Sequence, residues 1–317
     1  MTIDWEAPRF APGQGSLRAA APLAHWQTAA RVVSERHGLS PEGMEMAETG
    51  SDVVLDCGDF FVKLTAPAWA AELAVEAAML RRLQAARRVL PFLVPRVLGA
   101  GELSGWPYVV IGRVPGRSID AVWPGLDHAA RVALARRLGE LVRALHEVPV
   151  PDGASAEWPA FIQRMVAVAV ERERKRGVDE RWLAQIPGFV ATHLGMAQPP
   201  GPLCWLHTEL LGDHIRLSEQ DGEWRPVALL DFADSCVGDP RYELPALAEF
   251  VFKGETGCWD AFVDGYGRPI CAASGGRAGE WMAWSLVHQF GSLQRGLRAV
   301  GSPVPEQLSE LAMRLYR

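Results

Sequence analysis

The order of strand-like and helix-like segments constrains the fold of this chain more than any other feature of its sequence. Helix-like spacing of apolar residues covers 22–38, and an Ala- and Leu-rich run at 68–86 predicts one longer helix. Short β-prone runs, bounded by turns rich in Gly, Ser, Asp or Pro, predict strands at 44–48, 53–57, 60–64, 96–100 and 108–114. The first third of the chain is therefore predicted to form a small β-sheet with one long helix.

Beyond Pro115-Gly116 the pattern becomes mainly helical. The helix-like segments are 127–147, 158–175, 179–194 and most of the chain beyond residue 235. This order predicts an α+β, bilobal protein-kinase-like fold, with a small sheet-bearing N-lobe at 22–115 and a larger, mainly helical C-lobe at 116–317. Residues 1–21, which are rich in Ala, Pro and Gly, are expected to form a loose N-terminal arm.

Composition narrows the classes of partner and compartment. A formal charge of −6 argues against nucleic acid and anionic membrane surfaces, because both favour basic proteins. We see no secretory signal and no apolar run of the ~20 residues that a membrane helix needs. The five cysteines are scattered and odd in number, which indicates reduced thiols and a cytoplasmic protein. We expect neither nucleic acid nor a membrane as a partner, and a monomer or a homodimer.

Lys63 stands in the apolar run F-F-V-K-L, at the end of a predicted strand. It is either an edge-strand charge or a group that reaches phosphates and is held by a carboxylate. Glu72 and Glu76 lie four residues apart on the next helix, so they share a face and either could pair with Lys63. The turn Thr49-Gly50-Ser51 would let backbone amides approach phosphates closely.

Asp231 follows the apolar run V-A-L-L at 227–230 and opens the segment D-F-A-D. A carboxylate at the end of a buried strand needs a partner or a metal ion, and its hard oxygen suits Mg²⁺. The alternative is an aspartate that only begins a turn.

A second polar cluster, W-L-H-T-E-L-L-G-D-H, lies at 205–214. A hairpin between 215–217 and 227–230 would bring Glu209 near Asp231, so that one carboxylate orients a hydroxyl and the other holds a metal ion. Phosphoryl transfer requires that division of roles. A zinc site from His207, Glu209, Asp213 and His214 is conceivable, but no thiol or H-E-x-x-H pattern supports it.

A series of motifs, in order and at sensible spacing, resembles the aminoglycoside phosphotransferase family, the small-molecule branch of the protein-kinase-like fold. The motifs are V-K-L at 62–64, E-A-A-M-L-R-R-L from Glu76, V-P-R-V-L-G-A at 94–100, Y-V-V-I-G-R-V-P-G-R at 108–117, L-G-E-L-V-R-A-L-H-E-V-P at 138–149, and L-L-D-F-A-D with G-D-P-R-Y-E-L at 229–244. The similarity runs from about residue 22 to the C-terminal helices.

The resemblance implies an ATP-dependent transfer to a hydroxyl of a small molecule, with GTP as an alternative donor and Mg²⁺, or alternatively Mn²⁺, as the metal. The acceptor would be an aminoglycoside or another cationic or sugar-like compound. The implied residues are Lys63, Glu76, Gly50, Ser51, Ile111, Gly112 and Val114 at the nucleotide, Glu209 and His207 in catalysis, and Asp231 and His214 at the metal.

The catalytic loop departs from the family pattern H-G-D-x-x-x-x-N. Glu209 keeps a carboxylate on a longer arm, and a shift of about 1 Å can lower a rate by ~100-fold. His214 replaces an amide oxygen by an imidazole, a poor ligand for Mg²⁺ that suits Mn²⁺ better. Thr208 replaces glycine, which matters only if that residue needs a positive φ. Two hypotheses follow: a small-molecule kinase, or a pseudokinase-like scaffold that binds nucleotide with little or no transfer.

The acceptor side offers two weaker signals. Residues 231–270 contain eight Asp or Glu against three Lys or Arg, which would attract a cationic acceptor. Several of these carboxylates could instead serve the metal or helix surfaces. Trp259, Trp281 and Trp284 could form an aromatic acceptor wall, or they could simply be buried in the core.

Overall fold

The computed structural model describes residues 5–11, 13, 16–47, 50–87, 90–194, 202–267 and 278–316. The chain divides into two compact units. The sheet unit comprises Met1–Val89, Leu93–Pro115 and Leu229–Asp234, and the helical unit comprises Leu90–Phe92, Gly116–Ala228 and Ser235–Arg317. None of the described helices is long and apolar enough to cross a lipid bilayer.

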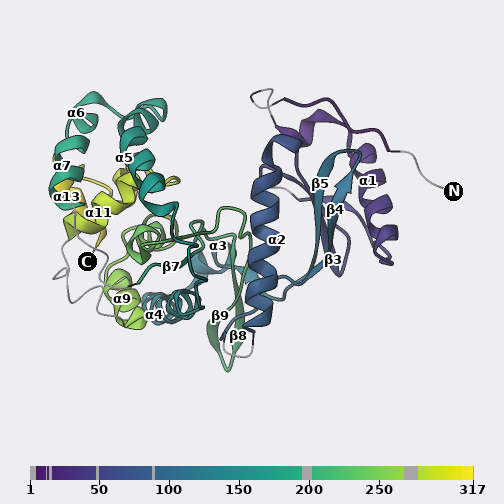
Figure 1. The fold of residues 1–317 in the computed structure, drawn as a ribbon. Coiled ribbons are helices and arrows are strands. Elements are labelled where there is room, and N and C mark those ends of the chain that lie inside the picture. The colour runs from purple at the N-terminus through teal and green to yellow at the C-terminus, as the bar shows by residue number, and fades with distance from the viewer. Residues whose placement is uncertain are drawn as a thin grey trace. The chain divides into compact units, whose positions relative to one another are not determined.

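The sheet unit is built on five antiparallel strands in the order β1-β2-β3-β5-β4. Their bounds are Glu45–Met46, Val53–Asp56, Phe60–Leu64, Val97–Leu103 for β4 and Trp106–Gly112 for β5. Figure 1 shows this sheet between two helices, α1 (Leu23–Arg36) and α2 (Ala70–Ala85). These elements confirm the strands and helices predicted for this part of the chain, with ends shifted by a few residues.

The two faces of the sheet have different cores because side chains alternate along a strand. Val62 faces α1, where it joins a large cluster that includes Trp26 and Trp106. Val109 faces α2 and packs with Leu73 and Ala77 in a smaller cluster. Any side chain on the α2 face therefore lies close to the helix predicted to follow Lys63.

The expectation of a loose N-terminal arm is wrong for the described part of that segment. Trp5 is only 4% exposed, and its ring lies 6.3 Å from those of both Trp26 and Trp106. Leu17 begins the short helix η1 (Leu17–Ala20) and is also buried in the cluster between the sheet and α1. A tryptophan buries a large apolar area, so it fixes the backbone even where Ala, Pro and Gly surround it.

The helical unit is mainly α-helical with two small sheets. Its helices are α3 (Ile119–Val122), η3 (Trp123–Gly125), α4 (His128–His146), α5 (Trp158–Lys175), α6 (Glu180–Leu183), α7 (Ile186–His193), η4 (Pro240–Tyr242), α8 (Leu244–Leu247), η5 (Ala248–Phe252), α9 (Cys258–Tyr266), α11 (Ala278–Val287), α12 (Leu293–Val300) and α13 (Leu308–Leu315). Its strands are β6 (Arg117–Ser118), β7 (Cys204–Leu206), β8 (Ile215–Gln220), β9 (Glu223–Leu229) and β10 (Cys236–Gly238), which pair as β6-β8-β9 and β10-β7.

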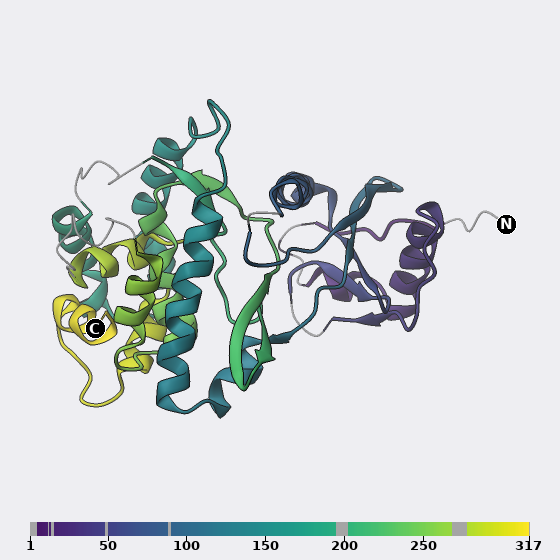
Figure 2. The same cartoon turned by 90° about the horizontal axis from the view of Figure 1, so that it is seen from below.

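Helices α4 and α9 pack side by side, as Figures 1 and 2 show. Two glycines allow their backbones to meet. A Cβ atom at Gly139 would lie 2.1 Å from the carbonyl oxygen of Phe262, and one at Gly265 would lie 1.9 Å from that of Arg136. No side chain fits between the two helices there, so both positions require glycine.

Two local predictions for the helical unit need correction. The helix expected over 179–194 is two helices, α6 and α7, and Pro187 stands at the start of the second. Proline is favoured there because it lacks an N–H to donate. The hairpin turn is shorter than expected: only Asp221 and Gly222 connect β8 to β9, with φ of 53° and 78°. Two such residues suit a tight hairpin turn, whose twist matches the strands.

Candidate active site

The position of Lys63 follows from the register of β3. Lys63 lies opposite Val54 on β2 and Val109 on β5, so its side chain shares the face of Val109 and points toward α2. On α2, Glu76 stands next to Ala77, in the buried stripe that packs on this face. The lysine and the glutamate are thus brought together by strand alternation and helix periodicity.

Lys63 is nearly buried and lies between three carboxylates. Its Nζ is 2.9 Å from Glu76, 3.2 Å from Asp52 and 3.2 Å from Asp231. Burial alone would lower the pKa of Lys63, but the charges of Glu76, Asp231 and Asp52 outweigh it and hold that pKa well above its ordinary value. The lysine is therefore a fixed positive charge, surrounded by an excess of negative charge.

The structure distinguishes between the two glutamates proposed for Lys63. Glu76 is 1% exposed and pairs with the lysine, and burial raises its pKa while the charge of Lys63 opposes that shift. Glu72 is exposed, and burial together with the charges of Asp234 and Asp52 raises its pKa. Asp231, Asp52, Asp234 and Glu72 give this part of the sheet unit a strongly acidic character.

Asp52 also belongs to the cluster around Lys63, but the sequence analysis did not predict it. The pairing of β2 with β3 could have indicated it, because Asp52 precedes Val54 by two residues and Val54 lies opposite Lys63. Residues two apart on a strand share a face. A carboxylate just before β2 is therefore placed on the same side of the sheet as the lysine.

The turn before β2 and the end of β5 hold the remaining residues that the sequence assigned to nucleotide binding. Gly50 has a φ of 104°, a conformation that favours glycine, and Ser51 next to it is exposed; Thr49 lies outside the described residues. Ile111 and Gly112 end β5 opposite Phe61 and Phe60. Val114, two residues on, is half-buried.

The segment that follows β7, residues 207–214, is called the Glu209 loop below. His207 and Thr208 are fully buried, whereas Glu209 is partly exposed. The backbone N–H of Glu209 donates to Nδ1 of His207 at 3.2 Å, so this histidine carries its proton on Nε2. The buried imidazole thus fixes the backbone from which the Glu209 side chain projects.

Thr208 adopts a φ of 66°, in the left-handed region. A β-branched residue is a genuine outlier there, because its Cβ crowds the backbone. The glycine that the family pattern has at this position is therefore replaced where its special conformation is needed. The loop keeps this conformation although the side chain disfavours it.

Buried hydrogen bonds hold Thr208 in that conformation. Its backbone N–H donates to Oε2 of Glu243 at 2.7 Å, and its hydroxyl accepts from the side chain of Gln289 at 3.3 Å. The other oxygen of Glu243 contacts Nε2 of His146 at 2.5 Å, and Nδ1 of His146 lies 2.7 Å from the hydroxyl of Tyr266. Helices α4 and α9 and the turn before α8 thus jointly secure the loop.

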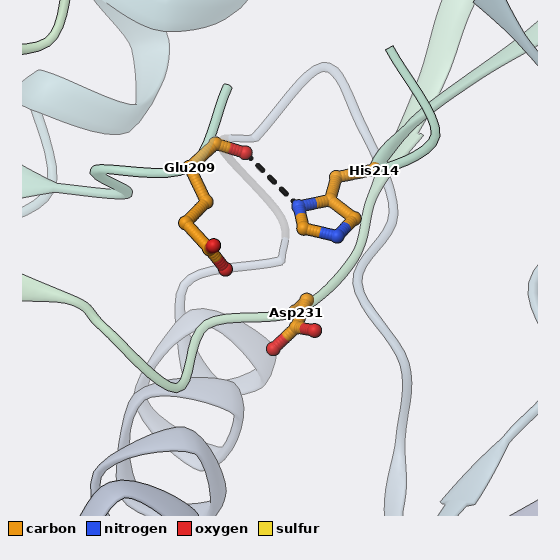
Figure 3. A group of neighbouring side chains, drawn as sticks. All are labelled: Glu209, His214 and Asp231. Carbon is orange, nitrogen blue, oxygen red and sulfur yellow. Dashed lines mark hydrogen bonds between the residues drawn. The ribbon is translucent and has the colours of Figure 1, made fainter. Parts of the chain in front are cut away.

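His214, at the end of the Glu209 loop, is one of the residues that could hold a metal ion. Its Nδ1 lies 3.0 Å from the carbonyl oxygen of Glu209, the dashed contact in Figure 3. A carbonyl only accepts, so Nδ1 carries the proton and Nε2 has a lone pair. Histidine ligands in metal sites are oriented in this way, with the second nitrogen bonded to a backbone carbonyl or a carboxylate.

Asp231 follows β9 and belongs to the sheet unit. Its φ is 60°, a conformation that aspartate tolerates better than most residues, and its side chain is 33% exposed. One oxygen, Oδ1, contacts Lys63. An aspartate that only begins a turn would need no such cation, so the ion pair argues against that alternative.

Most of the acidic residues in 231–270 have internal partners. Asp239 binds Arg241, Glu243 binds His146 and the Glu209 loop, and Glu249 accepts from the backbone N–H of Ser292. These three carboxylates are buried, so they do not present a surface to a cationic acceptor.

The tryptophans of the C-terminal helices are core residues. Trp259, Trp281 and Trp284 are 3%, 2% and 6% exposed. Trp259 and Trp281 also contact each other edge to face, with ring centroids 5.3 Å apart. Burial in the core, rather than an aromatic acceptor wall, is therefore the interpretation that the structure confirms for these three residues.

Comparison with known proteins places this geometry in a family. A profile of the phosphotransferase enzyme family matches residues 51–281. Among curated proteins, the chain is 24% identical over 218 residues to the lysine-specific demethylase JMJ21 of Arabidopsis thaliana, a match that covers 54% of this chain and 22% of that protein. The chain thus spans about a fifth of the length of that relative.

Solved structures share the fold at low sequence identity. The GDP complex of wild-type aminoglycoside 2'-phosphotransferase-IIIa matches with a TM-score of 0.67 and 18% identity, over 93% of this chain and 97% of the other. The ternary complex of streptomycin, ATP and APH(2'')-IIa gives 0.59 and 14%, over 89% and 98%. APH(3'')-Id from Streptomyces rimosus gives 0.58 and 18%, over 82% and 98%.

These likenesses confirm the α+β, protein-kinase-like fold predicted from the sequence. The family profile spans well over half of the chain, from the turn before β2 to the start of α11. The profile and the order of elements agree with the resemblance carried by the motifs around Lys63, His146 and Asp231. The chain therefore belongs to the phosphotransferase enzyme family.

Proposed function

We propose that the protein is a small-molecule kinase that transfers the γ-phosphoryl group of ATP, with GTP as an alternative donor, to a hydroxyl of its acceptor. Lys63, held by Glu76, contacts the α- and β-phosphates. The turn at Gly50 and Ser51 covers the phosphates with backbone amides. Ile111, Gly112 and Val114, at the end of β5, contact the base. Residues 22–115 form the nucleotide-binding lobe, and 116–317 form the catalytic and acceptor-binding lobe.

Glu209 accepts the proton of the acceptor hydroxyl as that oxygen attacks the γ-phosphorus and the bond to the β-phosphate oxygen breaks. His207 positions Glu209 through the hydrogen bond to its backbone N–H. The proposed acceptor is an aminoglycoside or another cationic or sugar-like alcohol. Asp239, Glu243 and Glu249 are buried and bound to internal partners, so other groups would have to recognise a cationic acceptor.

The chemistry of the donor set fits a divalent metal ion. The side chains drawn in Figure 3, Asp231, Glu209 and His214, offer two carboxylates and an imidazole. Two hard oxygens suit Mg²⁺, and the added nitrogen favours Mn²⁺. Asp231 and His214 would hold the ion, which when bound neutralises charge on the transferring phosphoryl group.

The observation that carries this proposal is the cluster around Lys63, with its three carboxylates at 2.9–3.2 Å. A buried lysine without function needs one partner, and a second and third carboxylate raise the negative charge beyond what it can neutralise. A divalent ion with nucleotide phosphates would balance that excess. A lysine that served only as a charge on an edge strand would not explain this excess of negative charge.

The test is a thermal-shift titration with ATP and either Mg²⁺ or Mn²⁺, followed by turnover assays with a panel of alcohols. We expect metal-dependent stabilisation by ATP and larger turnover with Mn²⁺. Asp231→Ala should abolish the metal-dependent part, whereas Asp264→Ala, an exposed carboxylate of α9, should leave it unchanged. Equal stabilisation of both variants would refute the metal site.

A nucleotide-binding scaffold with little or no transfer is the second candidate. It is favoured by the φ of 66° at Thr208, a left-handed conformation at the position where the family pattern has glycine. Glu209→Gln separates the two. In a kinase, the variant retains ATP binding and loses turnover by about 10²–10⁴-fold, the usual contribution of a general base. Absence of turnover in the parent protein with every acceptor, beside intact ATP binding, would favour the scaffold.

A further inference from the structure

A pocket lined by three arginines lies in the helical unit, among residues with no role in the proposed transfer. It has a volume of ≈ 330 Å³ and is formed by the end of α5 and the start of α12 with the segment before it. Small-molecule sites range from about 300 to 1,000 Å³, so the pocket suits a small ligand. Its lining residues are Arg176, Phe290, Ser292, Gln294, Arg295 and Arg298.

The buried carboxylates nearby are already engaged. Glu173 contacts Arg176 at 2.7 Å through one oxygen and accepts the backbone N–H of Leu293 at 3.0 Å with the other. Glu249 accepts the backbone N–H of Ser292 at 3.0 Å, and burial raises its pKa to about 8. At neutral pH most of Glu249 is therefore uncharged, and it does little to neutralise the arginines.

Arg295 is held rigidly and has unused hydrogen-bonding capacity. Its guanidinium lies over the ring of Phe250, 3.8 Å from the centroid, which leaves the N–H groups at its edge available. Its Nη1 is buried without a hydrogen-bond partner in the described part of the chain. Burial lowers the pKa of Arg295 with help from the like charges of Arg176 and Arg298, and together these effects outweigh the opposing charges of Glu249 and Glu173.

Arg298 lies one turn further along α12 and is exposed. Within the described ranges it forms no ion pair with a carboxylate, and the same holds for Arg295. Two guanidinium groups three residues apart on a helix share a face. They present paired donors to the pocket, and their mutual repulsion is relieved when an anion binds between them.

We propose that this pocket binds a phosphate-type dianion through Arg295 and Arg298, with Arg176 at its wall. Arginine suits phosphate because its planar fork donates two parallel hydrogen bonds to two oxygens. The guanidinium of Arg295, stacked on Phe250, is a preorganised donor at the pocket wall, which a freely solvated arginine is not. The ligand is either free phosphate or a small phosphate monoester.

Titration with inorganic phosphate, at ionic strength held constant with NaCl, tests the proposal by thermal shift and calorimetry. We expect saturable binding to the parent protein and a loss of about 10- to 100-fold in affinity for Arg298→Gln, the usual effect of removing one charged hydrogen-bonding partner. Arg298 is exposed, so this variant should fold normally. Arg295→Gln/Arg298→Gln should abolish the binding.

Two controls separate this pocket from general effects and from the nucleotide site. Arg174→Gln removes an exposed arginine of the same end of α5, which pairs with Glu171 and Glu180, and it should bind phosphate as the parent does. Lys63→Met, which the loss of its ion pairs destabilises, is measured by calorimetry at a temperature where it is still folded, and it should also retain phosphate binding. Unchanged affinity in Arg298→Gln, or loss of binding in folded Lys63→Met alone, would overturn the proposal.

A second titration with glycerol phosphate identifies the source of the ligand. Equal binding of the ester and of inorganic phosphate assigns the pocket to phosphate monoesters. Binding of inorganic phosphate alone assigns it to the free ion. Because neither measurement uses ATP, failure of the phosphotransferase proposal would leave this result unaffected.

Discussion

Replacing Thr208 by glycine and, in parallel, by alanine measures the backbone strain in the Glu209 loop. Both variants lose the hydroxyl that accepts from Gln289 and the buried methyl group, so these losses cancel in the comparison between them. The remaining difference is the Cβ atom at a φ of 66°. The pair of variants therefore isolates one backbone term.

The magnitude follows from two opposing effects. At an ordinary position glycine is less stabilising than alanine by roughly 0.5–1 kcal/mol, because the unfolded chain gains freedom. A left-handed φ costs a residue with a Cβ about 1–2 kcal/mol. We therefore expect Thr208→Gly to be more stable than Thr208→Ala by about 0.5–1 kcal/mol, which reverses the usual order.

Thermal and urea unfolding provide the measurement. For a unit of this size, about 1 kcal/mol corresponds to roughly 2–4 °C in Tm, so the glycine variant should unfold about 1–4 °C higher. Ala135→Gly, at a buried helical position of α4, is the matched control and should lower stability by ~1 kcal/mol or more. An alanine variant as stable as the glycine variant would refute the inference of strain.

Three further changes have defined outcomes. Lys63→Met leaves Asp52, Glu76 and Asp231 without their cation. We expect thermal shift to show loss of ATP binding, and urea unfolding to show a fall in unfolding free energy of about 3–5 kcal/mol. Retained ATP binding would contradict the proposed role of Lys63. Gly139→Ala places a methyl group against a backbone oxygen of α9 and should cost about 1–3 kcal/mol in urea unfolding, and a neutral effect would disprove the close packing. The pKa of Glu249 is raised from 4.5 to about 8 in the folded protein. Between these two values only the unfolded chain releases the proton, so the free energy of unfolding falls as the pH rises. Measured from pH 5 to 9, this free energy should fall less steeply for Glu249→Gln than for the parent protein.

The sheet unit could be predicted from the sequence because its information is local. Alternation along F-F-V-K-L defines which side chains share a face, and the turns on either side define which strands pair. Lys63 and Glu76 were found because the strand and the helix that carry them are adjacent in the chain. Asp52 required one further step, the register between β2 and β3.

In the helical unit, contacts between residues far apart in the sequence could not be predicted from local patterns. His146 and Glu243 are 97 residues apart, and each looks like an ordinary polar residue in its own segment. Their contact depends on the position of α4 against the turn before α8, and the contact of His146 with Tyr266 depends on the packing of α4 on α9 through Gly139 and Gly265. No periodicity reveals either. Trp5 was missed for the same reason: its neighbours in the chain predict no structure, and its partners lie far along the sequence.

The division of the chain has a consequence for how such a protein diverges. Asp231 shares a compact body with Lys63 although 168 residues separate them, because the short stretch Leu229–Asp234 returns to the sheet unit. Substitutions in α5–α13 reshape the walls of the helical unit without replacing any carboxylate around the lysine. The helical unit can therefore change its composition while the carboxylates around Lys63 stay in place.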